Sequence, residues 1–182
     1  MQSKVKSISL PSTSQLHDDL QHAYFHDSYQ MTLQTEEKTA LQLYLDLVAV
    51  CPDWINQLMT LRNKVVGYFG LKNQNLLGDI DKEKLATSYR VGDRVGIFSL
   101  LNISDNEVIL GETDKHLDVK LSLLKLSQNN LTSIAVSTVV HVNNRLGKLY
   151  MLFVTPMHKI IVPASLSHSF KTNSFKTNSF NK

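Results

Sequence analysis

Residues 117–142 read LDVKLSLLKLSQNNLTSIAVSTVVHV, and this stretch decides the fold. Apolar and polar side chains alternate on both sides of a central Asn-Asn pair, which is the period of a β-strand with one buried face. A two-residue hairpin loop at the two asparagines pairs Leu117 with Val142 and Asp118 with His141. In that register the apolar side chains of both strands share one face, whereas a slip of one residue would set apolar against polar throughout. The stretch therefore predicts an antiparallel hairpin with one register.

Further strands precede this hairpin. Turn-forming residues stand at Ser104-Asp105-Asn106 and at Asp114-Lys115, and the segment between them, residues 107–112, has the length of a strand. Connections this short join antiparallel neighbours, because a parallel crossover needs a dozen or more residues. The second half of the chain is therefore predicted to be an antiparallel meander.

Helical periodicity dominates the first half of the chain. Thr35 is the expected N-cap of a first helix, and the two glutamates after it suit the positive end of a helix dipole. Pro52 ends this helix and can begin the next, which carries apolar residues at helical spacing from Trp54 and stops near residues 67–70.

A last helix is expected from about Asn144. Its apolar residues trace one stripe that would lie across the apolar face of the meander: Leu146, Leu149, Tyr150, Phe153, Met157, Ile160 and Ile161. Pro156 falls inside this helix and removes one backbone hydrogen bond, so we expect a kink there. Phe153 is predicted to be a core residue whose truncation to alanine costs about 3–5 kcal/mol.

The C-terminal residues differ from the rest of the chain. From Ser169 they read SFKTNSFKTNSFNK, a pentapeptide repeat too short to form a packed layer. We expect a disordered tail over residues 169–182, after a single domain over residues 1–168. The formal charge of +3 comes from this tail, because residues 1–165 carry equal numbers of basic and acidic side chains. The body therefore lacks the basic surplus that nucleic-acid binding uses, and no nucleic-acid partner is expected.

Composition limits the remaining classes of protein. A hydrophobic content of 42% over 182 residues is typical of a globular domain. No uninterrupted apolar run reaches the roughly 18–20 residues of a membrane span. The N-terminus has no continuous apolar core of the secretory kind, and a single cysteine, Cys51, excludes a disulfide framework. We therefore expect a cytoplasmic protein with no membrane span.

Several segments resemble one bacterial family: YFHDSYQMTL, CPDWINQLMTLRNKVVGYFGLK, VGDRVGIFSLL, GETDKHLDVKLSLL and STVVHVNNRLGKLYMLFVTPMHKIIVPASL. They are similar, over residues 5–166, to the family known as domain of unknown function 2867. The order of elements, with an early strand near residues 24–33, also resembles the START/Bet v 1-like (SRPBCC) superfamily. The resemblance implies an α+β helix-grip fold. In that fold a curved antiparallel sheet wraps around a long C-terminal helix, leaves a cavity between them, and has two shorter helices near the N-terminal half.

Five residues are candidates for ligand binding: Arg62, Asp118, His141, Arg145 and Tyr150. Asp118 opposite His141 can fix the tautomer of a catalytic base, or the two can form an ordinary cross-strand pair on a face that looks solvent-exposed. Each arginine can hold an anionic head group with its guanidinium, or keep its charge in water while its methylenes cover the core. The ring of Tyr150 belongs to the apolar stripe, and its hydroxyl can reach the cavity.

The segment GETDKHLD, residues 111–118, places carboxylates around His116 at alternate positions. Such a group can bind a metal or transfer a proton, and it is also typical of a polar hairpin tip. His22 and His26 are four apart, and the family resemblance places them at the entrance of the first strand, where that spacing separates them by about 13 Å. There is no HExxH or GxGxxG motif, so we expect no metal and no cofactor.

These observations favour a domain that binds a small apolar or amphipathic molecule in a cavity between the sheet and the last helix. Two alternatives stay open. One is an enzyme of the same fold that uses acid and base groups in the cavity, and the other is an interaction module without a ligand. The sequence predicts neither a reaction nor an oligomeric state.

Overall fold

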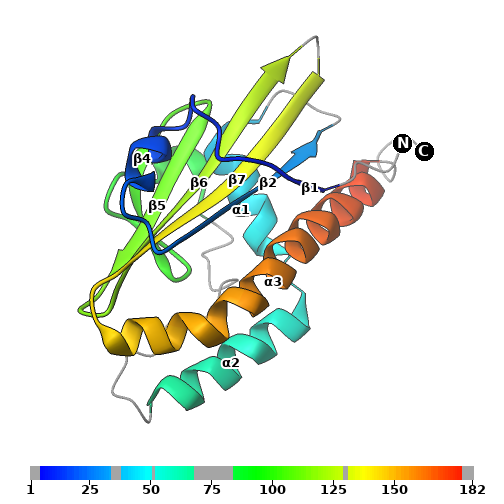
Figure 1. Cartoon of the computed structure of the whole chain (residues 1–182). Coiled ribbons are helices and arrows are strands. Elements are labelled where there is room, and N and C mark those ends of the chain that lie inside the picture. The colour runs from blue at the N-terminus through cyan, green and yellow to red at the C-terminus, as the bar shows by residue number, and fades with distance from the viewer. Residues whose placement is uncertain (1–4, 34–37, 51, 68–83, 129–130, 178–182) are drawn as a thin grey trace.

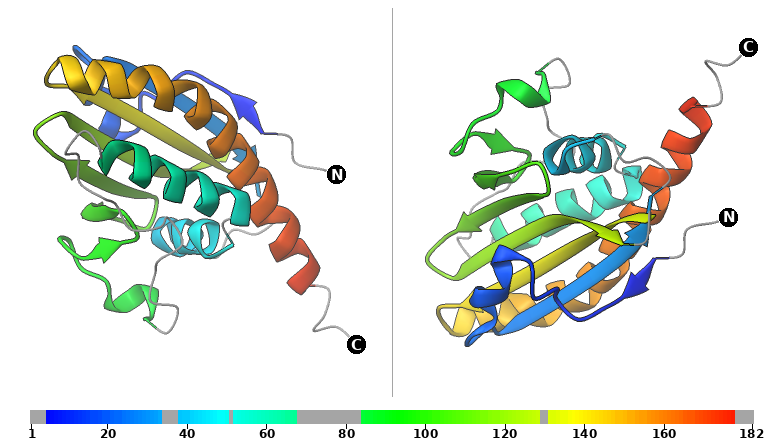
Figure 2. Two further views of the ribbon diagram at one scale, coloured as in Figure 1. Left: turned by 90° about the horizontal axis from the view of Figure 1, so that it is seen from below. Right: turned by 90° about the horizontal axis from the view of Figure 1, so that it is seen from above.

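The computed structural model describes residues 5–33, 38–50, 52–67, 84–128 and 131–177. Seven antiparallel strands form one curved sheet in the order β1-β2-β7-β6-β5-β4-β3 (Figure 1). The strands are β1 (Lys6–Ser7), β2 (Phe25–Thr32), β3 (Arg94–Val95), β4 (Phe98–Ile103), β5 (Glu107–Thr113), β6 (Leu117–Gln128) and β7 (Leu131–Val142). Helices α1 (Ala40–Ala49), α2 (Asp53–Gly67) and α3 (Arg145–Thr177) lie on one face of the sheet (Figure 2). This is the α+β helix-grip layout that the sequence predicted.

The register of the β6–β7 hairpin is the predicted one. Leu117 pairs with Val142 and Asp118 pairs with His141. The turns before β5 and before β6 are also confirmed, because the Ser104 N–H donates to the Glu107 carbonyl and the Asp114 N–H to the Leu117 carbonyl. The two asparagines of the hairpin loop lie outside the described residues.

Helix α1 starts later than predicted. Thr39 is its N-cap: the Thr39 hydroxyl accepts from the Gln42 N–H, and the Gln42 side chain accepts from the Thr39 N–H. This reciprocal capping box satisfies two backbone donors at once, which a lone threonine further upstream cannot do. Thr35, the expected cap, lies outside the described residues. The break between the first two helices is confirmed, because α1 ends before Pro52 and α2 begins directly after it.

The predicted apolar stripe of α3 is only partly right: Tyr150, Met157 and Ile161 line the space between α3 and the sheet, but other residues of the stripe face solvent. Leu149 is 47% exposed, and Phe153 and Ile160 are each 65% exposed. The helix instead turns Gly147, Met151, Leu166 and Ser169 inward, and all four are buried. Figure 1 shows α3 bending part-way along its length, and both Pro156 and a second proline, Pro163, lie inside it.

Gly147 explains which side of α3 meets the sheet. A Cβ atom at this position would lie 2.5 Å from the backbone oxygen of His116 and 2.9 Å from a methyl group of Val142. No side chain fits such an approach, so only the glycine face can approach the end of β6. Asn144 fixes the same contact, since its side-chain oxygen accepts from the Gly147 N–H and its amide donates to the Lys115 carbonyl.

The outer face of the sheet is covered, although the sequence suggested a solvent-facing surface. The N-terminal segment, including the 3₁₀ helix η1 (Gln15–Leu20), crosses this face on the side opposite the long helices (Figure 2). Leu10 and Leu16 pack there against Ile109 and Val139 in a small second core. The main core lies on the other face, between the sheet, α1 and part of α3.

Helix α3 also extends beyond the predicted domain boundary at residue 168. It continues to Thr177, and the buried Ser169 hydroxyl donates to the Leu47 carbonyl of α1 at 3.1 Å. The first residue of the repeat therefore packs against the domain. The disorder expected for the tail stays a prediction.

Candidate functional site

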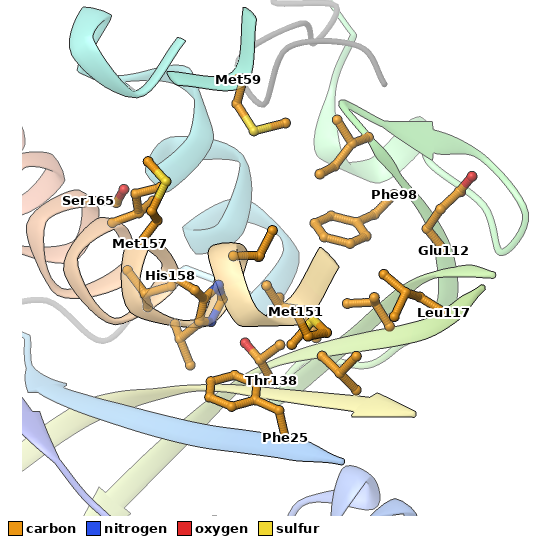
Figure 3. A pocket seen from close by; sticks show the side chains of 18 of the residues that line it. Phe25, Met59, Phe98, Glu112, Leu117, Thr138, Met151, Met157, His158 and Ser165 are labelled. Atoms are coloured by element: carbon orange, nitrogen blue, oxygen red, sulfur yellow. The ribbon is translucent and has the colours of Figure 1, made fainter. Parts of the chain in front are cut away.

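An apolar pocket of about 270 Å³ lies between the sheet and the three helices (Figure 3). Its walls are mostly aliphatic and aromatic side chains, including Leu117, Val119, Leu121, Val136 and Val140 of the sheet, Leu47 and Val48 of α1, and Met151, Val154 and Ile161 of α3. Inward-facing residues of β6 and β7 line it because alternate residues of a strand share a face. Cavities that bind small molecules are typically apolar with a few placed polar groups.

One wall of this pocket carries two polar side chains, His158 and Thr138, and a third, Asp27, contacts His158 without itself lining the pocket. His158 projects from α3, and its Nε2 lies 3.3 Å from Oδ1 of Asp27 on β2. Asp27 is the direct cross-strand partner of Thr138 on β7. Opposed residues of neighbouring strands have Cβ atoms about 4.5–5.5 Å apart, so the carboxylate and the hydroxyl are adjacent. Figure 3 shows His158 and Thr138 beside each other at the pocket, with Phe25 next to them.

This polar group is incompletely hydrogen-bonded. The Asp27 side chain is only 9% exposed. Among the described residues, neither Oδ2 of Asp27 nor Oγ1 of Thr138 has a hydrogen-bond partner, and both atoms are buried. An unsatisfied buried polar group costs about 1–3 kcal/mol, more when it is charged. A ligand hydroxyl or N–H group would satisfy the carboxylate, and a hydroxyl would satisfy Thr138 as well.

Two aromatic residues surround the pair. The Phe25 ring meets the His158 ring edge-on, with centroids 5.6 Å apart and planes at 88°, and so holds the imidazole in place. Tyr29 follows Asp27 on the same face of β2. Burial, then the negative charge of Asp27 and a side-chain hydrogen bond with it, raise the pKa of Tyr29 above its ordinary value. Tyr44 of α1 also lines the pocket, and burial raises its pKa strongly, so both phenols stay protonated at neutral pH.

A family model described as protein of unknown function (DUF2867) matches residues 20–165. The chain belongs to the DUF2867 family. The match covers the pocket and the three polar residues His158, Thr138 and Asp27, whereas most of η1 and the repeat lie outside it. No curated protein and no solved structure matches the chain.

Of the five candidates that the sequence suggested, only Tyr150 is known to line the pocket of this DUF2867 member. Asp118 and His141 are cross-strand partners, as predicted, but they lie on the outer face of the sheet. There the Asp118 carboxylate accepts from the Thr113 hydroxyl at 2.8 Å, and Nε2 of His141 donates to the Asp19 carbonyl at 2.9 Å. These contacts attach η1 and a neighbouring strand to the outer face.

The structure places only one of the two candidate arginines, Arg145. Arg145 is the first residue of α3 and is exposed outside the pocket lining. Arg62 belongs to α2, and its side chain lies outside the described part of the structure.

Of the titratable residues of GETDKHLD, Glu112 and Asp114 border the pocket, whereas His116 and Asp118 are not part of its lining. Glu112 lines the pocket but pairs with Arg94 at 2.9 Å. Asp114 also borders the pocket, and its carboxylate accepts from the backbone N–H groups of His116 and Leu117, which shapes the turn. Within the described residues, no group of three His, Cys, Asp or Glu side chains could hold a metal ion. The segment is a hydrogen-bonded hairpin turn.

Sequence reasoning missed the His158–Asp27 pair at the pocket wall, of which His158 lines the pocket. Asp27 and His158 are 131 positions apart, so no local spacing connects them. One signal was present: on a strand over residues 24–33, Asp27 shares a face with the apolar residues Phe25, Tyr29 and Met31. A lone carboxylate among inward-facing apolar side chains marks a position that needs a partner from another element.

Proposed function

We propose that this protein binds a small, largely apolar molecule with one polar end in the pocket between the sheet and α3. The observation that carries the proposal is the buried Thr138 hydroxyl, which faces a mostly apolar pocket and has no partner in the described structure; Oδ2 of Asp27, its cross-strand neighbour, also lacks one. The apolar part of the ligand would take the space along β6, β7 and α3. Its polar end would exchange a hydrogen bond with Thr138 at the pocket wall and, next to it, donate to the Asp27 carboxylate.

Native mass spectrometry of the purified protein, compared with its denatured mass, tests this proposal. A reproducible extra mass on the folded protein is the expected result, and its value indicates the class of ligand. A folded protein that carries no extra mass, and that takes up no molecule from a lipid or metabolite extract, contradicts the proposal.

Two threonines on β7 provide a matched pair of variants. Thr138→Val removes the hydroxyl at the pocket, and Thr132→Val removes a buried, equally unpartnered hydroxyl on the same strand that does not line the pocket. One hydrogen bond corresponds to about fivefold in affinity, so Thr138→Val should bind about fivefold more weakly. Thr132→Val should bind like the unmodified protein. Equal binding by both variants would show that the Thr138 hydroxyl does not contact the ligand.

The His158–Asp27 pair favours a second candidate, an enzyme that transfers protons in the same pocket. A carboxylate that accepts from Nε2–H of a neutral imidazole leaves the lone pair on Nδ1, which is the arrangement of a positioned general base. The ligand released from the protein would then change mass on incubation with it, and His158→Gln would abolish the change. A bound molecule that is recovered unchanged supports binding alone.

We also propose kinship with the START/Bet v 1-like superfamily and a cytoplasmic location. The helix-grip layout and the pocket under the last helix support the kinship. A solved structure of this chain that superimposes on that superfamily with the same strand order would test it. Cell fractionation would test the location.

A further inference from the structure

Helix α3 carries an apolar stripe that no other part of the described structure covers. Four large residues are exposed along it: Leu149 (47%), Leu152 (68%), Phe153 (65%) and Ile160 (65%). Residues 149, 153 and 160 recur at helical spacing, so they form one continuous face. This face points away from the side that buries Met151 and Ser169. Monomeric proteins rarely leave such a contiguous apolar surface without a use.

All the charged side chains of α3 that titrate as acids or strong bases are basic. Its 33 residues contain no aspartate or glutamate, and no acidic residue follows Asp118 anywhere in the chain. Arg145, Lys148 and Lys159 are all exposed. At about 100° per residue, Lys148 and Lys159 lie directly beside Leu152 along one edge of the apolar stripe. An apolar face bordered by basic residues is the pattern of a helix that lies in the surface of an anionic membrane.

The same helix does not fit a core helix or a membrane span. Residues Arg145–Ser169 are long and apolar enough to cross a bilayer. Only 11% of the most apolar 18-residue stretch of this segment is buried, whereas a core helix would be mostly buried. A spanning helix needs lipid or protein contacts on all sides, and the inward side of α3 is committed to the sheet through Gly147 and Met151. Only its outward side is free to meet a membrane.

We propose that α3 docks this protein peripherally on anionic lipid membranes. Phe153 and Ile160 enter the boundary between head groups and acyl chains, and Lys148 and Lys159 contact the lipid phosphates. A second copy of the chain is a poorer occupant, because two such faces would bring basic residues against basic residues. The proposal uses the outward side of α3 and is independent of the pocket and its ligand.

Vesicle co-sedimentation of the full chain tests the docking. The protein should bind vesicles of phosphatidylcholine mixed with phosphatidylserine, should bind vesicles of phosphatidylcholine alone much more weakly, and should be released by high salt. The double variant Phe153→Ser/Ile160→Ser should bind about tenfold more weakly or worse. Lys148→Gln and Lys159→Gln should each lower binding about fivefold. Val91→Ser, which changes a 63% exposed apolar residue outside α3, should leave binding unchanged.

Two results would overturn the proposal. One is equal sedimentation with both types of vesicle, or none with either, by a protein with an unperturbed circular dichroism spectrum. The other is a dimer in size-exclusion chromatography with light scattering that Phe153→Ser/Ile160→Ser converts to a monomer, because a second copy would then occupy the face. Retained ligand mass in the same serine variant would show that the pocket is intact, so the two proposals can fail separately.

Discussion

A carboxylate with little exposure lies on each face of the sheet, Glu107 on the outer face and Asp27 on the inner one, and the two differ in how completely they are hydrogen-bonded. On the outer face, Glu107 is 4% exposed; its Oε1 accepts from the Ser14 and Ser122 hydroxyls at 2.5 and 2.6 Å, and its Oε2 from the Gln15 N–H at 3.1 Å. On the inner face, Asp27 has a 3.3 Å contact to His158 and a side-chain hydrogen bond with Tyr29, but its Oδ2 has no partner in the described structure. Buried polar groups in a stable fold are normally satisfied. The satisfied carboxylate therefore has a structural role, and the unsatisfied one lies beside the site where we propose that a ligand binds.

The largest expected effect tests which residues form the inner face. Leu166 of α3 is fully buried in the main core, whereas Phe153 is 65% exposed. Leu166→Ala should lower the free energy of unfolding by about 3 kcal/mol or more, and Phe153→Ala by no more than about 0.5 kcal/mol. Urea denaturation of both variants measures the difference. The reverse order would mean that α3 turns its other side to the sheet.

The outer carboxylate provides the next largest effect. Glu107→Gln keeps the shape of the side chain but removes the charge that strengthens its hydrogen bonds, so unfolding should become easier by about 2 kcal/mol. The matched control is Asp118→Asn on the same face, where a single contact to an exposed hydroxyl predicts a loss below about 1 kcal/mol. Equal losses in the two variants would show that η1 does not depend on the Glu107 cluster.

These contrasts also show how far the sequence could predict the structure. The hairpin register followed from alternation alone, because Leu117, Val119 and their partners must share a buried face. The facing of α3 followed only in part, because apolar residues extend around much of the helix: Tyr150 and Ile161 of the predicted stripe line the pocket, whereas Phe153 is exposed. Gly147 determines which side of α3 meets the sheet, because its missing side chain allows contact with the His116 backbone. Hydrophobic periodicity gives no weight to a glycine.

The site was predictable only in outline. A cavity under the last helix was expected from the resemblance, but the polar group at its wall joins residues from β2, β7 and α3, which the chain order keeps far apart. Asp118 opposite His141 was found because a hairpin register can be read locally. The same reasoning could not tell that η1 would cover this pair on the outer face, since the segment Gln15–Leu20 shows no strong apolar period.

The inner carboxylate should give a smaller effect on stability than the outer one. Asp27→Asn removes a buried charge whose hydrogen bonds are incomplete, so the free energy of unfolding should change by less than about 0.5 kcal/mol in either direction. Retained ligand should nevertheless decrease about tenfold, since a charged acceptor contributes more than a neutral one. Denaturation and native mass spectrometry on one preparation measure both quantities. A destabilisation as large as that of Glu107→Gln would give Asp27 a structural role as well.

The smallest effect concerns the charge of Asp27 itself. The pKa of Tyr29 is raised above the ordinary 10.0 by burial and then by the Asp27 carboxylate, whereas the pKa of Tyr44 is raised by burial alone. Asp27→Asn should therefore lower the pKa of Tyr29 and leave that of Tyr44 unchanged. Ultraviolet titration of tyrosinate measures both pKa values. Subtracting the curves of the Tyr29→Phe and Tyr44→Phe variants assigns each pKa value to its tyrosine.

The same shifts set the direction of the pH dependence of stability. Raised pKa values mean that the folded state holds these protons more tightly than the unfolded state does, so the free energy of unfolding is unaffected below about pH 10 and falls as the pH rises beyond it. The fall should be shallower in Asp27→Asn. If the pKa of Tyr29 does not move in this variant, the Asp27 carboxylate does not act on Tyr29, and burial alone raises its pKa.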